Sequence, residues 1–150
     1  MKADPRAWAE EGPGFDGGKI ALLFDGAVAV LRRDNISSIP WPNRIDLPGG
    51  GREGSESGVC CVLRETREEI SLRLAPERVV WARLFSRSDG QLTWFCVARL
   101  YQFEPDRMRL GDEGQSCWMM PVADFLQSAE SIPDLQVRLR CALSELGEPF

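Results

Sequence analysis

Three glutamates near the middle of the chain have the spacing with the clearest chemical meaning. Glu65, Glu68 and Glu69 stand three, four and one residues apart, so on a helix they lie on one face. Carboxylates placed this way repel each other, at roughly a few tenths of a kcal/mol per pair, unless a cation lies between them. Oxygen ligands of this kind suit Mg²⁺. Taken alone, an acidic helix face is more often a solvated surface, so the neighbouring sequence must decide.

Three consecutive glycines, residues 49–51, come shortly before the acidic segment. Glycine has no Cβ, so its backbone can approach an ion or a phosphate closely. On the glycines alone, a flexible connection into the helix is the simpler interpretation. Arg64 stands four residues before Glu68 and can pair with that carboxylate or orient it. The alternative is an ordinary surface ion pair that contributes little.

The acids need a helix to present them, and the apolar residues around them predict one over residues 57–70. Ser57 is a suitable N-cap. The apolar stripe recurs at helical spacing and has one weakly apolar member, Thr66. Its members are Val59, Val62, Leu63, Thr66 and Ile70. The acids therefore project away from the packed face.

The remaining elements predict a mixed β-sheet sandwiched by helices, an α/β fold of the α+β kind. Asp25-Gly26 between two apolar runs predicts a β-hairpin over residues 19–32. A second hairpin is predicted from apolar runs that suggest burial on both faces. It comprises residues 78–86 and 92–103, and it is followed by a strand at 117–121 and helices at 122–128 and 132–146. We expect an irregular lead-in at residues 1–18, held only by Trp8 and Phe15, and one domain at 19–150.

Composition narrows the function classes. The net charge of -5 and the absence of clustered Lys and Arg argue against nucleic-acid binding. The odd count of five cysteines without a C-x-x-C pair fits reduced thiols and a cytoplasmic location. No segment approaches the roughly 18 apolar residues that a membrane span needs. The chain has no histidine, so a histidine general base is excluded.

The segment 50–72 resembles the Nudix box, G-x5-E-x7-R-E-U-x-E-E-x-G-U, in which U is a bulky apolar residue. The matching residues are Gly50, Glu56, Arg64, Glu65, Glu68, Glu69 and Leu72. Two positions depart from the pattern: Thr66 replaces an apolar residue, and Ser71 replaces the final glycine. Neither position supplies a metal ligand, so the departures concern packing and the turn at the end of the helix. The resemblance implies the α/β/α sandwich of that family.

The resemblance also implies hydrolysis of a nucleoside diphosphate linked to another group, with Mg²⁺ or Mn²⁺. Pyrophosphate repels a nucleophile, so cations must neutralise its charge. Glu68 and Glu69 are the first choices as metal ligands, together with the carbonyl of Gly49. Glu65 is a further ligand or the base that orients the attacking water. Arg64 would position these acids.

Two further regions supply candidate site residues. Glu113 stands in an E-G-Q setting similar to that of an additional metal ligand or base in the Nudix branch that hydrolyses oxidised nucleoside triphosphates; the alternative is a solvated loop acid. The Gly50 backbone would approach the phosphates. Trp41, in a proline-flanked loop, is the best candidate for stacking on a base, because tryptophans are more often core residues. The other candidates are Trp81, Trp94 and Trp118.

The sequence therefore predicts a metal-dependent pyrophosphohydrolase for a small nucleotide, as a monomer or a homodimer. A nucleoside triphosphate, ordinary or oxidised, is slightly favoured over ADP-ribose or a nucleotide sugar. A non-catalytic nucleotide-binding or regulatory module is the second class, and the complete acidic set weighs against it. A purely structural acidic helix is the third, and a magnesium titration of the melting temperature separates it from the others.

Overall fold

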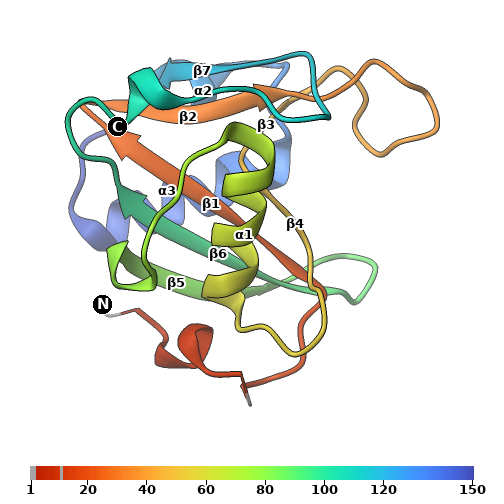
Figure 1. The fold of residues 1–150 in the computed structure, drawn as a ribbon, viewed down its shortest axis with the longest axis vertical. Helices are drawn as coiled ribbons and strands as arrows, with labels where there is room; N and C mark the ends of the chain where they lie inside the picture. Colours follow the sequence, from red (N-terminus) through yellow and green to blue (C-terminus); the bar gives the residue numbers. More distant parts are fainter. Residues whose placement is uncertain (1–2, 11) are drawn as a thin grey trace.

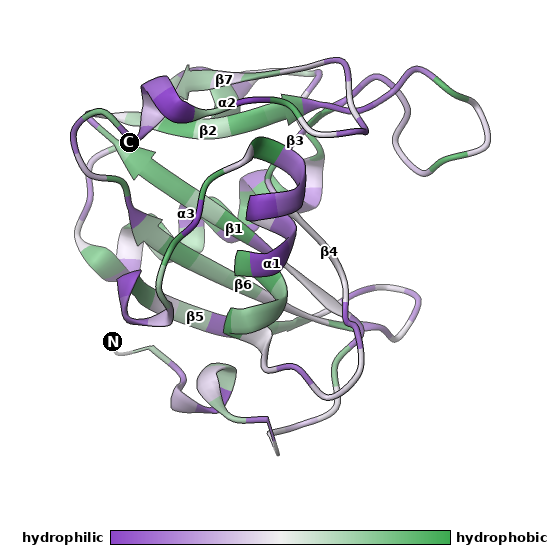
Figure 2. Ribbon diagram, viewed as in Figure 1, coloured by the Kyte–Doolittle hydropathy of each residue, from purple (hydrophilic) through white to green (hydrophobic). Residues whose placement is uncertain are grey.

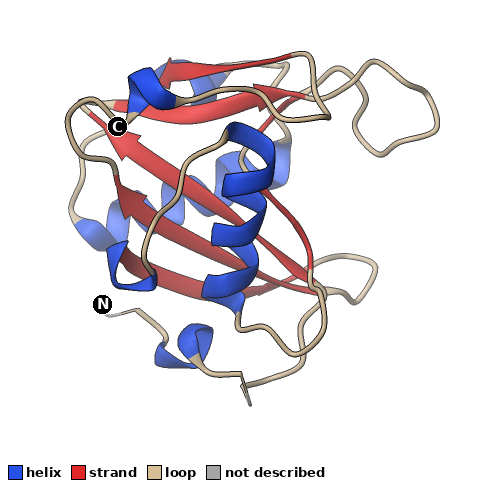
Figure 3. Cartoon of the chain, in the orientation of Figure 1, coloured by secondary structure: helices blue, strands red, loops and turns tan. Residues whose placement is uncertain are grey.

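The computed structural model describes residues 3–10 and 12–150 and shows a mixed seven-stranded sheet with helices on both faces (Figure 1, Figure 3). The strands are β1 (Gly17–Phe24), β2 (Ala27–Arg32), β3 (Ile45–Asp46), β4 (Gly49–Gly51), β5 (Val79–Ser86), β6 (Leu92–Arg99) and β7 (Ser116–Pro121). The helices are α1 (Gly58–Ile70), α2 (Val122–Gln127) and α3 (Pro133–Leu146), with 3₁₀ turns η1 (Pro5–Trp8), η2 (Pro76–Arg78) and η3 (Pro105–Arg107). The α/β/α sandwich expected from the sequence is confirmed.

The sheet is antiparallel except at its centre, where β1 and β6 run parallel. Its main strand order is β3-β2-β1-β6-β5, with β4 paired to β1 and β7 to β2. The predicted first hairpin is confirmed: its turn residues Asp25 and Gly26 have φ angles of 49° and 77°, which the two-residue turn needs. The short strand β4 therefore lies directly beside the central strand β1.

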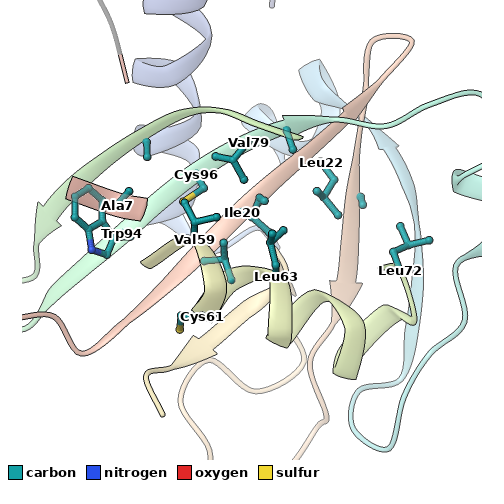
Figure 4. Close-up of a cluster of buried hydrophobic side chains, with 14 of the residues drawn as sticks. Ala7, Ile20, Leu22, Val59, Cys61, Leu63, Leu72, Val79, Trp94 and Cys96 are labelled. Atoms are coloured by element: carbon teal, nitrogen blue, oxygen red, sulfur yellow. The ribbon is translucent and has the colours of Figure 1, made fainter. Parts of the chain in front are cut away.

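The central strands β1 and β6 are largely hydrophobic (Figure 2). Alternate residues of these strands pack into two apolar cores, one on each face of the sheet. In Figure 4, Val59 and Leu63 of α1 point toward Ile20 of β1 in the first core. The second core lies between the sheet and α3, and Ala21, the next residue of β1, belongs to it. Trp94 and Trp81 are each 1% exposed, which confirms them as core residues.

Helix α1 begins and ends as its sequence requires. The Ser57 side chain accepts a hydrogen bond from the Cys60 N–H at 3.1 Å, so the predicted N-cap is confirmed. The two departures from the Nudix pattern are both accommodated. Thr66 is buried and its hydroxyl donates to the Val62 carbonyl at 2.7 Å. Ser71 adopts φ 65° at the C-cap and donates to the Arg109 carbonyl.

The N-terminal segment packs on the domain around more residues than the sequence suggested. Phe15 is buried, and the Trp8 indole N–H donates to the Pro76 carbonyl at 3.2 Å, as expected for anchors. In addition, Ala7 is fully buried and lies in the same core as α1. The Asp4 N–H also donates to the Ala82 carbonyl of the edge strand β5. Residues 1, 2 and 11 of the expected lead-in lie outside the described residues.

The second hairpin forms, but two expectations about it are wrong. Strand β6 ends at Arg99 rather than at residue 103, because the chain turns there: Phe103 has φ 75°, and it and Tyr101 are exposed. Burial on both faces holds for β6 but not for β5. A bulge between Val79 and Trp81 leaves Val80 exposed. Among the described residues, no helix combines the length and apolar character of a membrane span.

Candidate functional site

Two acids of α1, Glu65 and Glu69, are one helical turn apart and face the consecutive glycines Gly50 and Gly49 of β4. The Glu69 carboxylate accepts a hydrogen bond from the Gly49 N–H at 2.8 Å. One turn earlier, the Glu65 carboxylate lies against the Cα of Gly50, because a Cβ added there would be 2.7 Å from Glu65 Oε1. Of the predicted site, the structure thus brings together Glu65, Glu69, Gly49 and Gly50.

Arg64 connects the other acids. Its guanidinium donates to Glu56 at 2.9 Å, to Glu65 at 3.1 Å and to Glu68 at 2.8 Å. Glu56, and after it Glu65, raise the pKa of Arg64 well above its usual value, although burial opposes this shift. Glu68 itself is exposed on the outer side of this cluster. Arg64 therefore fixes the positions of the acids, whereas Glu56 also accepts the Glu53 N–H and holds the loop before the helix.

Glu69 lies in an environment that disfavours its negative charge when no cation is bound. Burial is the main cause and raises its pKa to about 7, and Asp46 and Glu65 add repulsion. The Lys19 ammonium and the Gly49 N–H oppose that shift. Burial likewise raises the pKa of Glu65, while Arg64 lowers it. A positive ion bound between Glu65 and Glu69 would relieve this repulsion.

Lys19 and Asp46 form a polar group beside these glycines that the sequence analysis missed. Asp46 is fully buried and accepts from Lys19 Nζ at 2.9 Å and from Arg33 Nη1 at 3.0 Å. Lys19 Nζ also donates to the carbonyl of Gly49 at 3.3 Å. The carbonyl implied as a metal ligand thus already faces a cation. A lysine in an apolar strand was the available signal in the sequence.

Glu113 is not assembled with these acids. Its loop is tied to the end of α1, since the Gly111 N–H donates to the Glu69 carbonyl at 2.8 Å and the Arg109 N–H to the Ile70 carbonyl at 3.0 Å. The Glu113 side chain is nevertheless exposed. Across residues 3–10 and 12–150, no three or more His, Cys, Asp or Glu side chains are arranged ready to hold a metal ion. Arg64 occupies the space between Glu65 and Glu68 instead.

A pocket of about 390 Å³ opens on the α3 side of the sheet, next to β4. Its floor crosses Gly51, Gly17 and Thr93, which are neighbours on β4, β1 and β6. Gly50 and Trp41 also line it, so both predicted substrate-binding residues lie at one pocket. Its charged lining residues are Asp16, Lys19, Arg33, Asp46, Arg87, Asp134 and Arg138. Gly50 therefore lies between this pocket and the Glu65 carboxylate.

The residues present suit a divalent cation of the Mg²⁺ type. The available donors are carboxylate and carbonyl oxygens, which such ions prefer. The close approach of Glu65 to Gly50 uses the space that a Cβ would fill. Next to this contact, Glu69 accepts the Gly49 N–H, and the Gly49 carbonyl accepts from Lys19. The donor atoms thus have the right chemistry for such an ion, and in this structure Arg64 and Lys19 bind them instead.

Gly50→Ala tests whether this contact matters for cation binding. The added methyl group would displace the Glu65 carboxylate, which is the flexible end of a side chain, so we expect the fold to persist. Because misplacement of about 1 Å can cost roughly a hundredfold in function, Mn²⁺ affinity should fall by about tenfold to a hundredfold. A titration followed by electron paramagnetic resonance measures it. Gly51→Ala is the matched control, since its added Cβ would meet only the Asp16 carbonyl at 3.9 Å. Equal affinities of the two variants would contradict the role of this contact.

Fold and site together define a class: an α/β/α sandwich in which an acidic helix packs on a glycine strand beside a polar pocket. The NUDIX domain family model matches residues 18–138, and the chain therefore belongs to the Nudix hydrolase family. The family resemblance stated from the box residues is confirmed.

Similar proteins are found both by sequence and by structure. A NAD-capped RNA hydrolase NudC of Mycobacterium tuberculosis is 40% identical over 79 residues, which are 51% of this chain and 24% of that protein. The chain thus spans about a quarter of the length of the curated relatives it matches. A MutT/nudix family protein from Enterococcus faecalis has a TM-score of 0.60 at 26% identity, covering 73% of this chain and 44% of that one.

The fold also matches more distant structures. A bifunctional NMN adenylyltransferase/ADP ribose pyrophosphatase from Francisella tularensis, complexed with AMP and a manganese ion, has a TM-score of 0.68 at 16% identity. The match covers 89% of this chain and 42% of that one. At this identity the likeness supports the α/β/α sandwich and not a substrate.

Proposed function

We propose that the chain is a metal-dependent pyrophosphohydrolase that cleaves a nucleoside diphosphate linked to a second group. One observation carries the proposal: Gly50 lines the polar pocket on one side and contacts the Glu65 carboxylate on the other. A phosphate chain held along β4 would therefore lie within reach of the acids of α1, while the attached nucleoside enters the pocket.

The residues of this chain divide into two roles. Glu65, Glu68, Glu69 and the Gly49 carbonyl would hold Mg²⁺ or Mn²⁺. Such an ion neutralises the charge on the phosphate oxygens and makes phosphorus more open to attack. Arg64 positions the carboxylates, because it bonds to Glu65 and Glu68 at once. For Glu68 to join the set, its bond to Arg64 must lengthen or be shared.

The base that takes a proton from the attacking water is Glu65 or Glu113. Glu65 is the better supported of the two, because it already contacts β4 and its pKa is raised by burial, which suits a proton acceptor. Glu113 would have to move from its exposed position, together with the loop that Gly111 ties to α1. A larger loss of turnover in Glu65→Gln than in Glu113→Gln, with Mn²⁺ affinity retained, would assign the base to Glu65.

Trp41 would contribute to nucleoside binding from the pocket rim. It is 43% exposed, and the Arg44 guanidinium lies 5.9 Å from its ring centre. An exposed indole at the mouth of a pocket offers a flat surface for a base.

Two substrate classes are proposed, each on a separate observation. The E-G-Q setting of Glu113 favours a nucleoside triphosphate. The similarity to a NAD-capped RNA hydrolase over half of the chain favours a dinucleotide linked through its pyrophosphate, such as NAD. ADP-ribose and nucleotide sugars belong to the same chemical type. A non-catalytic nucleotide-binding module is the remaining alternative.

A substrate panel tests the function. The purified protein is incubated with Mg²⁺ or Mn²⁺ and nucleoside triphosphates, oxidised triphosphates, ADP-ribose, nucleotide sugars, dinucleoside polyphosphates, NAD and a NAD-capped oligonucleotide, with Glu69→Gln as the blank. Product release that disappears in the blank supports the hydrolase and names its substrate class. Cleavage of the capped oligonucleotide would correct the expectation that no nucleic acid is bound. If no substrate of the panel gave product while nucleotides still bound, the non-catalytic binding module would be favoured.

A further inference from the structure

Arg138 is a buried cation that lines the pocket at the end away from β4. It lies on α3, is 7% exposed and donates from Nη1 to the Thr93 hydroxyl at 3.0 Å. Its guanidinium lies 5.1 Å from the ring centre of Phe85. Among the described residues, no carboxylate lies within 4.0 Å of it. One hydroxyl and one aromatic ring do not neutralise a guanidinium, which has five N–H donors.

A buried charge without a partner lowers the stability of the folded protein. Its presence here therefore suggests a role other than stability. Burial is the main factor that lowers the pKa of Arg138, and the nearby Arg87 lowers it further, while Asp134 acts in the opposite direction. An arginine does not lose its proton under these conditions. The positive charge therefore persists in the free protein and is available to a group that enters the pocket.

The other cationic side chains of the pocket already form ion pairs with carboxylates. Lys19 and Arg33 share the buried Asp46 carboxylate, and Arg87 pairs with Asp89 at 3.2 Å on the exposed rim. Arg138 is the buried guanidinium of the lining that has no such partner within the described part of the chain. Negative charge entering the pocket would thus gain most at Arg138.

The position of Arg138 separates it from the proposed pyrophosphate site. Its partner Thr93 lies two strands from Gly51, with Gly17 between them. Neighbouring strands lie about 4.8 Å apart, so Thr93 is roughly 10 Å from β4. A group that meets Arg138 is therefore a different part of the ligand from the phosphates beside Glu65.

We propose that Arg138 binds a second phosphoryl group, carried by the nucleoside of the substrate, and so determines specificity. This inference rests on the proposed function, because it places the nucleoside in the same pocket. A neutral base edge would satisfy N–H donors but leave the charge uncompensated. A phosphomonoester satisfies both, and the planar guanidinium matches its oxygens in a bidentate geometry.

Equilibrium binding tests the proposal without turnover. Calorimetry in Mg²⁺ compares AMP, adenosine 2′,5′-bisphosphate, adenosine 3′,5′-bisphosphate and inorganic phosphate, none of which contains an anhydride to cleave. We expect one bisphosphate to bind at least about tenfold more tightly than AMP, since charge-assisted hydrogen bonds have this strength. In Arg138→Met that ratio should fall to about one. Arg140→Met, an exposed arginine of the same helix, is the control and should keep the wild-type ratio.

Thermal unfolding of the free protein separates ligand binding from a structural role. Arg138→Met removes an uncompensated buried charge. The melting temperature of this variant should therefore be the same as that of the wild type or higher by up to about 2–4 °C. A fall of several degrees would show that the Thr93 and Phe85 contacts make Arg138 structural, which overturns the proposal.

The remaining outcomes also decide the question. Equal binding of AMP and both bisphosphates, or no binding of any of them, would overturn the inference. Binding of inorganic phosphate alone, lost in Arg138→Met, would overturn it in favour of a free-anion site. Failure of the proposed function is distinguishable, because it would show as absent product release across the substrate panel.

Discussion

Replacing Glu69 with glutamine is expected to lower product release by about a hundredfold to a thousandfold while the domain stays folded. Glutamine keeps the shape of the side chain and an oxygen that can accept the Gly49 N–H. It removes the negative charge that would hold the cation, and loss of one well-placed electrostatic group typically costs this much. Turnover with Mg²⁺ on the best substrate of the panel measures the effect, and circular dichroism checks the fold.

A second measurement ties this loss to the cation. Mg²⁺ should raise the melting temperature of the wild type, because an ion that binds only the folded state stabilises it by mass action, and this rise should shrink in Glu69→Gln. Glu77→Gln is the matched control, since Glu77 is exposed at η2 and does not line the pocket. If Glu69→Gln kept wild-type turnover, the assignment of the cation to α1 would be wrong.

Local sequence rules accounted for the elements whose signals lie within a few residues. The N-cap of α1 at Ser57 and the turn at Asp25-Gly26 were predicted because each depends on side chains and backbone angles of the element itself. The end of β6 was missed because Tyr101 and Phe103 have strand-forming side chains. What ends the strand is a turn in which the exposed Phe103 adopts φ 75°.

The candidate site shows the same division between local and long-range information. The spacing placed Glu65 and Glu69 on one helix face, the resemblance to the Nudix box named them as site residues, and the structure places both against β4. Their partners could not be named in this way. Asp46 meets Lys19 only because β1 pairs with β4 and β2 with β3. Arg138 reaches the pocket through the packing of α3 on β6 at Thr93, a contact between residues 45 positions apart.

Replacing Val62 with aspartate is expected to unfold the domain, because it should lower the free energy of unfolding by more than about 4 kcal/mol. Val62 is fully buried in the core between α1 and the sheet, so close to β1 that a Cβ added to Gly18 would lie 2.7 Å from its Cγ1. An aspartate there would be a buried charge without a partner, or a protonated acid without hydrogen bonds, and both are unfavourable. Circular dichroism and denaturant titration measure the loss.

The Val62→Asp substitution tests which side of α1 packs against the sheet. Cys60→Asp is its control. Cys60 is exposed in the first turn of the same helix, where an acidic side chain interacts favourably with the helix dipole, so that variant should fold with near wild-type stability. Glu69 stands seven residues after Val62, so the two lie on nearly the same side of α1. Val62 is buried in the core, and Glu69 lies at the edge of that packed side against β4. A folded Val62→Asp protein would mean that the helix presents Val62 to solvent, and Glu65 and Glu69 would then no longer face β4.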